Sequence, residues 1–112
     1  MMTTKAVVSR LGLSASGVSF QSRLGRDPWL EPYTEPTVKH LAQSGVKRLG
    51  VVCPAFVSDC LETLEEIGEE VRDVFIENGG ESFVLIPCLN AQAGWVTAFS
   101  NLLHEFINQL PR

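Results

Sequence analysis

The sequence predicts an α/β fold, a parallel sheet with helices on both faces, and two observations support this prediction. Apolar, strand-like segments alternate with amphipathic helical segments along most of the 112 residues. In addition, residues 51–67 run from an apolar strand through a proline into an acidic helix. The first N–H groups of a helix that follows a parallel strand point toward open space, where α/β proteins bind ligands. We therefore expect a functional site near this junction.

The first half of the chain has short elements separated by turn-forming residues. Residues 3–11 are predicted to form an amphipathic helix, because Gly12 provides a usual end for such a segment. Residues 17–22 are predicted to be a strand, and residues 23–36 a loop, because prolines and a glycine interrupt that stretch. Residues 38–43 belong to a short helix that a glycine ends two residues later.

The second half has longer and more regular elements. Residues 48–53 are apolar and rich in β-branched side chains, and Pro54 ends this expected strand because proline has no N–H to donate. A long helix follows from about residue 59 to 78, and two consecutive glycines end it. Residues 82–86 are the last expected strand, and residues 93–110 the closing helix.

The expected helix at residues 59–78 has an apolar face and an acidic face. At about 100° per residue, the apolar face consists of Cys60, Leu64, Ile67, Val71 and Val74. The acidic face consists of Glu62, Glu66, Glu69, Asp73 and Glu77. Asp59 is the expected N-cap, with Glu62 as its capping-box partner. Such a carboxylate row is either a solvated surface or a path that passes cations or accepts protons, and spacing does not choose between them.

Size and composition indicate a single domain over residues 1–112. Three strands are few for a doubly wound, Rossmann-like sheet, and the chain begins with a helix. We therefore expect one half of a larger α/β protein, truncated at its N-terminus. No apolar run approaches the roughly 18 residues that a membrane-spanning helix needs.

Charge and cysteine content argue against a nucleic-acid-binding protein, a disulfide-stabilised protein and a zinc protein. Residues 1–50 carry seven Lys and Arg against three Asp and Glu, whereas residues 51–112 carry two against ten. Scattered bases without a stacking motif do not favour nucleic acid as a partner. The three cysteines form no Cys-x-x-Cys pair, so neither a disulfide framework nor a zinc site is expected, and a reducing cytoplasm is favoured.

The loop at residues 20–30 is the second unusual element. It carries Trp29 and the arginines Arg23 and Arg26 directly after an expected strand. Arginine binds carboxylates in a forked geometry and tryptophan offers a flat apolar face, so an aromatic ligand with carboxylates would fit. The alternative is a loop that Trp29 and Leu30 attach to the core.

Several segments resemble the C-terminal part of ferrochelatase. The first reads Phe-Gln-Ser-Arg at residues 20–23 and continues through Pro-Trp-Leu at 28–30. The second reads Cys-Pro-Ala-Phe-Val-Ser-Asp-Cys-Leu-Glu-Thr-Leu-Glu-Glu over residues 53–66. The resemblance continues through Gly-Gly-Glu at 79–81 and Ile-Pro-Cys-Leu-Asn at 86–90. It therefore covers nearly the whole chain from about residue 19.

The resemblance implies a lyase of the chelatase-like family, which inserts ferrous iron into protoporphyrin IX at the last step of protohaem synthesis in haem biosynthesis. It also implies two similar α/β halves with the porphyrin between them. Glu62 and Glu66 match acidic residues on the active-site side of the family's helix, with Glu62 nearest the porphyrin as the catalytic residue. Both would guide the metal, and Glu62 would also accept pyrrole protons. The residues expected to shape the porphyrin pocket are Gln21, Ser22, Arg23 and Trp29.

Two departures from the family pattern matter. Cys60 stands where many members have a histidine, although a cysteine there is similar to a known bacterial pattern. The N-terminal half is missing, as is the strand with the histidine usually regarded as central to metal insertion. We therefore expect this chain alone to be weakly active or inactive, with the missing portion as its partner. Ferrous iron is a substrate, and no tightly bound cofactor is expected.

A rival interpretation is a non-catalytic tetrapyrrole-binding or assembly module that a second copy completes by self-association. An exposed apolar sheet edge, left by the missing strand, would favour such pairing. Peripheral contact with a membrane stays open under both interpretations, because the porphyrin is hydrophobic.

Overall fold

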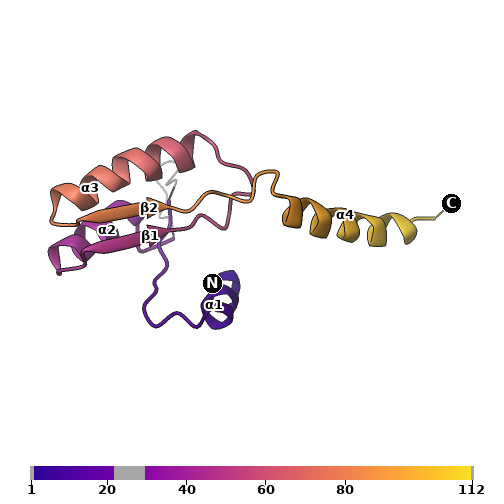
Figure 1. Ribbon diagram of the computed structural model, residues 1–112, viewed down its shortest axis with the longest axis horizontal. Helices are drawn as coiled ribbons and strands as arrows, with labels where there is room; N and C mark the ends of the chain where they lie inside the picture. The colour runs from indigo at the N-terminus through magenta and orange to yellow at the C-terminus, as the bar shows by residue number, and fades with distance from the viewer. Residues whose placement is uncertain (1, 22–29, 112) are drawn as a thin grey trace.

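The computed structural model describes residues 2–21 and 30–111. In chain order the elements are α1 (Met2–Leu11), α2 (Thr34–Gln43), β1 (Arg48–Val51), the π-helix η1 (Glu62–Val71), α3 (Arg72–Glu77), β2 (Ser82–Leu85) and α4 (Ala93–Asn108). β1 and β2 pair in parallel, with Arg48 opposite Ser82 and Val51 opposite Leu85. The α/β fold with a parallel sheet is therefore confirmed (Figure 1).

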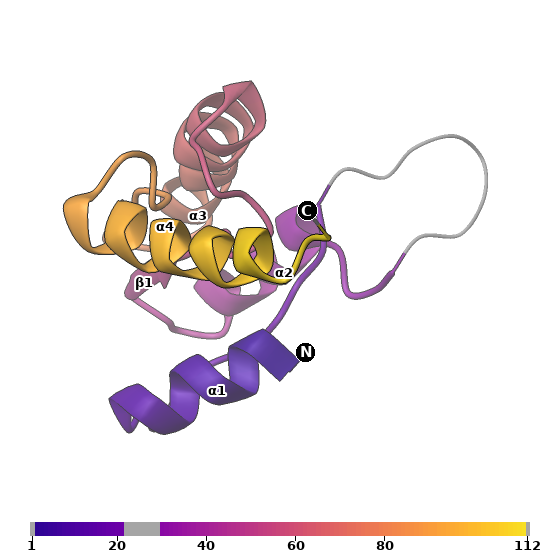
Figure 2. The ribbon, with the colours of Figure 1, turned by 90° about the vertical axis from the view of Figure 1, so that its right-hand side faces the viewer.

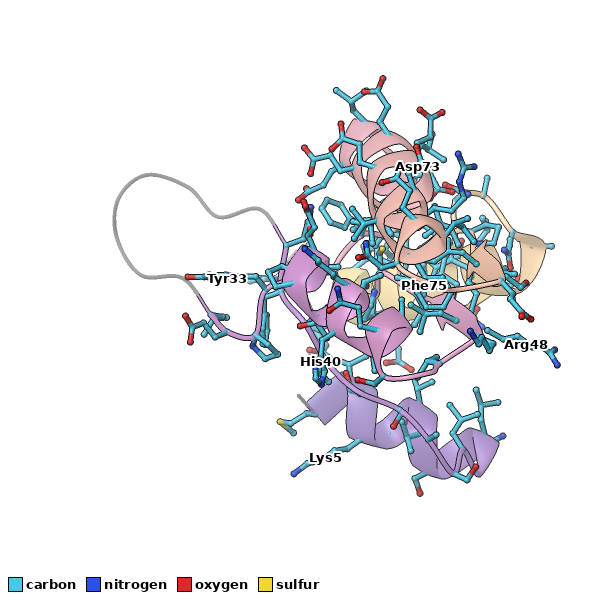
Figure 3. The ribbon with its side chains drawn as sticks, turned by 90° about the vertical axis from the view of Figure 1, so that its left-hand side faces the viewer. Lys5, Tyr33, His40, Arg48, Asp73 and Phe75 are labelled. Atoms are coloured by element: carbon cyan, nitrogen blue, oxygen red, sulfur yellow. The ribbon has the colours of Figure 1, made fainter. Side chains whose placement is uncertain are left out.

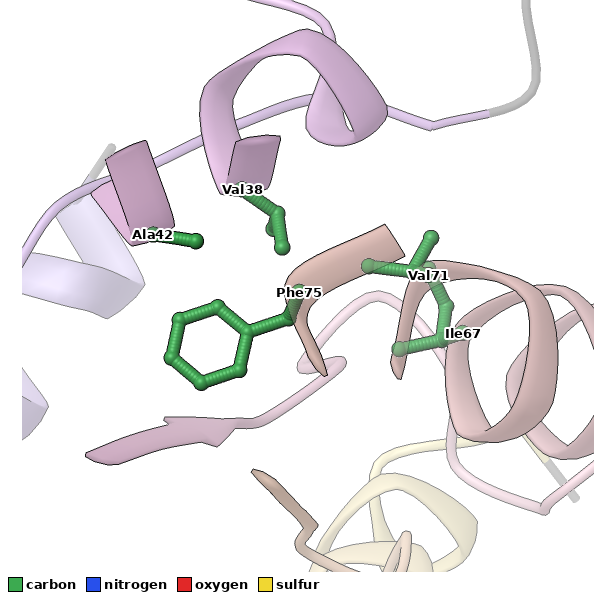
Figure 4. Close-up of a cluster of buried hydrophobic side chains, with 5 residues drawn as sticks. All are labelled: Val38, Ala42, Ile67, Val71 and Phe75. Carbon is green, nitrogen blue, oxygen red and sulfur yellow. The ribbon is translucent and has the colours of Figure 1, made fainter. Parts of the chain in front are cut away.

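The core lies between the sheet and the helices α2, η1 and α3. Alternate strand residues point toward it, because successive side chains of a strand face opposite sides; they are Leu49, Val51, Phe83 and Leu85. The buried helix members, shown in Figure 4, are Val38, Ala42, Ile67, Val71 and Phe75. The ring of Phe75 lies 6.0 Å from that of Phe83 and joins helix to sheet.

The helices cover one face of the two strands. On the opposite face Val84 of β2 is 56% exposed. Within the described ranges, no helix lies on that face, so the second helical layer expected from the sequence is not seen there. The expected strand at residues 17–22 is also wrong over its described part, where Phe20 makes a single bridge to Tyr33 and no ladder.

Glycines end the helices where the sequence predicts. Gly12 has a φ of 64°, Gly45 of 99° and Gly79 of 115°, a left-handed conformation that glycine adopts without steric cost. Gly80 has a different role, because a Cβ atom at this position would collide with the Phe75 ring. The chain can therefore turn from α3 into β2 while lying directly against the largest buried side chain.

The two terminal helices extend away from this body. α1 lies apart from the body in two perpendicular views, and α4 projects beyond the sheet (Figure 1, Figure 2). Neither contacts another helix or strand among the described residues. The radius of gyration is 17.1 Å, against about 13 Å for a compact domain of this length. In the part of the chain that the structure describes, no helix is both long and apolar enough to cross a membrane.

Candidate functional site

Hydrogen bonds connect the two loops that leave the carboxyl ends of β1 and β2. The amide of Asn90 donates from Nδ2 to Oδ2 of Asp59 at 2.9 Å, and the Asp59 N–H donates to Oδ1 of Asn90 at 2.8 Å. The Cys88 N–H also donates to the Asp59 carboxylate, at 3.3 Å to Oδ2. These bonds lower the pKa of Asp59, that from Asn90 most strongly. Asp59 therefore holds both loops as an ionised carboxylate.

Asp59 also contacts the start of the helix, but not as the sequence predicts. Its Oδ1 accepts a hydrogen bond at 3.0 Å from the hydroxyl of Thr63, which is completely buried. The Cys60 N–H donates to the same hydroxyl oxygen at 2.9 Å. The predicted capping box between Asp59 and Glu62 is wrong, because the residue at the N-cap is Leu61 and no side chain caps this helix.

Glu62 stands beside this network without joining it. It is half-buried, and its Oε1 is a buried oxygen with no hydrogen-bond partner. Burial raises the pKa of the Glu62 carboxyl, and the negative charge of Glu66 raises it further. Such a carboxylate is a stronger base than an exposed one, and one of its oxygens is free to accept a proton or a cation.

Glu66 is held from the N-terminal side of the chain. The amide of Gln21 donates from Nε2 to Oε2 of Glu66 at 3.3 Å. Gln21, which is expected to shape the porphyrin pocket, is therefore placed beside the carboxylate pair. The other three expected pocket residues, Ser22, Arg23 and Trp29, lie outside the described residues.

The π-helical geometry of η1 separates Glu62 and Glu66 from the other acids. A π-helix closes each hydrogen bond between residues five apart, so its turn is wider and residues four apart nearly align. Glu62 and Glu66 are half-buried, whereas the remaining acidic residues of the helix are exposed: Glu65, Glu69, Glu70, Asp73 and Glu77. The predicted single row over residues 62–77 is thus divided into a half-buried pair and a solvated surface.

The pair alone is a weak metal site. Among residues 2–21 and 30–111, no group of three or more His, Cys, Asp or Glu side chains could hold a metal ion. All three cysteines are free. Burial raises the pKa of the Cys53 thiol, and burial with a hydrogen bond to Asp59 raises that of Cys88 to about 11. These two thiols are therefore protonated near neutral pH.

Two site residues escape the sequence patterns. Thr63 lies on the apolar side of the helix as a small polar residue, and Asn90 lies in an irregular loop. Asn90 has a φ of 51°, a conformation that asparagine tolerates better than most residues. Asn90 ends the Ile-Pro-Cys-Leu-Asn segment of the family resemblance, but that segment does not reveal its partner 31 residues earlier in the chain.

Comparison with known proteins finds relatives that match most of this chain. A family model described as Ferrochelatase matches residues 1–107. The Ferrochelatase of Stutzerimonas stutzeri is 56% identical over 102 residues, 89% of this chain and 30% of the relative. That of Pseudomonas putida is 52% identical over 107 residues, 94% of this chain and 32% of the relative. That of Methylibium petroleiphilum is 51% identical over 111 residues, 97% of this chain and 31% of the relative.

The matched region is therefore a limited part of those proteins. The chain spans about a third of the length of the curated relatives it matches. The similarity nevertheless includes both loops at the strand ends and the whole of η1, because the family model extends over residues 1–107. By the extent of that match, the chain belongs to the ferrochelatase family.

Proposed function

We propose that this chain provides the acidic part of a ferrochelatase site, in which ferrous iron enters protoporphyrin IX to give protohaem. The observation that carries the proposal is the half-buried Glu62 carboxylate, whose Oε1 has no hydrogen-bond partner. Because the chain spans about a third of the length of its relatives, we assign the complete reaction to an assembly that also contains a counterpart of the rest of that length. The chain alone is expected to be weakly active or inactive.

The chemistry requires a base beside the porphyrin. A free-base porphyrin carries two pyrrole N–H protons, and both must leave when a divalent metal takes their place. A carboxylate can accept such a proton only if a lone pair is not already occupied, and its efficiency increases as its pKa rises toward the working pH. Glu62 meets both conditions, because its pKa is raised and its Oε1 is unpartnered. It is the proposed catalytic residue.

Metal delivery requires ligands that release the ion again. Glu66 lies close enough to raise the pKa of Glu62, and its own Oε2 accepts a hydrogen bond from Gln21. Two carboxylates without a third ligand bind a divalent cation weakly. Iron would therefore pass across Glu66 and Glu62 as a substrate, and no tightly bound cofactor is proposed.

The porphyrin itself would contact the loop that follows Gln21. By the family resemblance, the propionate groups would meet Arg23, and the flat ring system would lie near Trp29 and Ser22. The contact between Gln21 and Glu66, at 3.3 Å, supports this proposal, because it connects that loop to the carboxylate pair. We also propose a cytoplasmic location, which three free cysteines support.

The test separates porphyrin binding from metal insertion. Purified chain is titrated with protoporphyrin IX, ferrous iron is added without oxygen, and the metalloporphyrin spectrum is followed with and without the remaining portion of the enzyme. Glu62→Gln should leave porphyrin affinity nearly unchanged and lower the insertion rate at least about a hundredfold, the usual effect of losing a general base. Glu77→Gln, at an exposed position of the same helix, is the matched control. Equal insertion rates for wild type and Glu62→Gln would refute the proposal.

A second candidate function has one observation in its favour. In α4 the apolar side chains Val96, Phe99, Leu103 and Ile107 are each more than 40% exposed, and the helix contacts no other described element. Such a surface favours a non-catalytic tetrapyrrole-binding module that a second copy completes. Sedimentation at high protein concentration distinguishes the two, because a clean monomer would contradict self-association.

A further inference from the structure

Asn90 is exposed, yet both its backbone and its side-chain amide make hydrogen bonds to the loop that follows β1. Its backbone N–H donates to the carbonyl of Val57 at 2.8 Å. Its side-chain amide uses both ends, donating to Oδ2 of Asp59 and accepting from the Asp59 N–H. Its φ of 51° is the left-handed conformation that most residues avoid. Three hydrogen bonds therefore hold one strained residue against the loop that leads into η1.

The orientation of this amide is determined by its partners. An ionised carboxylate only accepts hydrogen bonds and a backbone N–H only donates them. Asp59 presents both its carboxylate and its backbone N–H to Asn90, so Nδ2 of Asn90 must face the carboxylate and Oδ1 must face the N–H. No other natural side chain of this length supplies a donor and an acceptor in the same fork. Aspartate has the same shape but would face Asp59 with a second negative charge.

The contacts continue from Asp59 into the first turn of the π-helix. Oδ1 of Asp59 accepts a hydrogen bond from the Thr63 hydroxyl at 3.0 Å. The hydroxyl oxygen of Thr63 in turn accepts a hydrogen bond from the Cys60 N–H at 2.9 Å. The Leu64 N–H then donates to the Cys60 carbonyl at 2.9 Å. In the sequence Glu62 lies between Cys60 and Leu64, whose backbones take part in these hydrogen bonds. The Oε1 atom of Glu62 itself has no hydrogen-bond partner. Its position therefore depends on the neighbours that hold its backbone.

We propose that Asn90 is a positioning residue, which fixes the start of η1 through Asp59 and Thr63 and so places the Glu62 carboxylate. This inference rests on the proposed function of Glu62. If the inference is correct, placing Glu62 depends on a residue of the loop after β2 as well as on the loop after β1. Both side-chain hydrogen bonds of Asn90 are made to Asp59, so we infer that Asn90 acts on Glu62 through Asp59 and Thr63.

The experiment uses the 112-residue chain with two substitutions at Asn90. Asn90→Gly keeps the left-handed backbone and removes the side chain, and Asn90→Asp keeps the shape and removes the donor. Asn101→Ala, on an exposed position of α4, is the control. The first measurement is hydrogen exchange at the amides of Cys60 and Leu64, whose acceptors are the Thr63 hydroxyl and the Cys60 carbonyl rather than Asn90. The second is the broadening of the Glu62 and Glu66 carboxylate carbon signals by Mn²⁺ alone.

Both Asn90 variants should increase exchange at Cys60 and Leu64 at least about tenfold, and should weaken Mn²⁺ broadening at Glu62 at least about threefold. Asn90→Asp should be no better than Asn90→Gly, whereas a role in shape alone would be restored by aspartate. Asn101→Ala should match wild type in both measurements.

Three outcomes would overturn the inference: unchanged exchange at Cys60 and Leu64, unchanged Mn²⁺ broadening at Glu62, or full recovery in Asn90→Asp. The Glu62→Gln variant distinguishes failure of the proposed role of Asn90 from failure of the proposed function of Glu62. If Glu62→Gln leaves Mn²⁺ broadening at Glu66 and the Mn²⁺ affinity unchanged, the metal role of Glu62 is wrong. The exchange result still stands in that case, because it requires no metal.

Discussion

Along η1 and α3, the side chains that face the sheet and those that face away differ in burial and in hydrogen bonding. The inward side chains are completely or almost completely buried at every fourth residue, and they are Thr63, Ile67, Val71 and Phe75. The outward side chains are acidic, and Figure 3 shows Asp73 on the outer side of the helix while Phe75 points into the body. One face of the helix stabilises the fold, and the other carries an excess of negative charge, because Arg72 is the only basic residue between residues 62 and 77.

The largest effect is expected from the inward face. Phe75→Ala should lower the free energy of unfolding by about 3–5 kcal/mol, because it leaves a cavity between α3, Phe83 and Gly80. Urea unfolding followed by the methyl NMR signals of Ile67 and Val71 measures the change. Ile76→Ala, at a position that is 43% exposed, should change it by less than about 1 kcal/mol. Similar costs for the two variants would contradict the assignment of the core.

The next effect tests the polar end of the inward face. Thr63→Val preserves the volume of the side chain but leaves the Cys60 N–H without its acceptor and Asp59 without one donor. The free energy of unfolding should fall by about 1–3 kcal/mol, the usual cost of an unsatisfied polar group in a buried place. Thr97→Val on the exposed surface of α4 should have almost no effect. A neutral Thr63→Val would mean that the hydroxyl contributes nothing to stability.

A substitution on the outward face should have the opposite sign. Glu62→Met removes a buried oxygen without a partner, so the free energy of unfolding at neutral pH should rise by about 1 kcal/mol. The pKa of Glu62 is raised above 4.5 in the folded state, so ionisation costs stability as the pH rises through that folded pKa. The gain from Glu62→Met should therefore disappear below about pH 4.5. A gain independent of pH would show that packing, not charge, causes it.

The carboxylate of Asp59, three residues before Glu62, has the opposite pKa shift. Hydrogen bonds from Asn90, Cys88 and Thr63 lower its pKa below 3.8 in the folded state. Its stabilising contribution is therefore fully present above pH 3.8 and is lost as the pH falls through the lower folded pKa. Asp59→Asn should destabilise the chain at neutral pH and approach wild type in strong acid. Unfolding curves of wild type and Asp59→Asn at a series of pH values measure both the loss of stability at neutral pH and its disappearance in acid.

The smallest effect is expected from the single ion pair among the described residues. Arg72 and Asp73 are 3.2 Å apart, but their side chains are 47% and 60% exposed. Solvent screens such a pair, so Arg72→Ala should change the free energy of unfolding by less than about 0.5 kcal/mol. A larger loss in the same urea assay would show that the outward face contributes to folding.

The sequence predicts the order of elements well but not the type of the central helix. A period of 3.6 residues places Leu64 in the core, yet Leu64 is 55% exposed and Thr63 is completely buried. The π-helical turn is wider than an α-helical one, so Thr63, Ile67 and Val71, which are spaced four residues apart, share the inward face. Phe75 continues that face in α3. That repeat of four is visible in the sequence, although few helices are π-helical and the α-helical period is the reasonable expectation.

The candidate site is predictable only where its residues are local. Glu62 and Glu66 lie on one helix, so their spacing is readable from the sequence. The contact between Gln21 and Glu66 joins residues 45 positions apart, and the pair of Asp59 and Asn90 joins residues 31 apart. Such contacts follow from the parallel pairing of β1 and β2 and from the path of the loops, which local patterns do not specify.

The independence of α4 affects how unfolding of this chain can be observed. Its 16 residues contact no other described element, so only local helix propensity and the stacking of Trp95 on Phe99 at 5.1 Å stabilise it. Isolated helices of about this length are marginal in water, so α4 should melt gradually and separately from the sheet and its covering helices. The chain as a whole is then not a two-state system, and the fluorescence of Trp95 reports the state of a helix rather than the state of the fold.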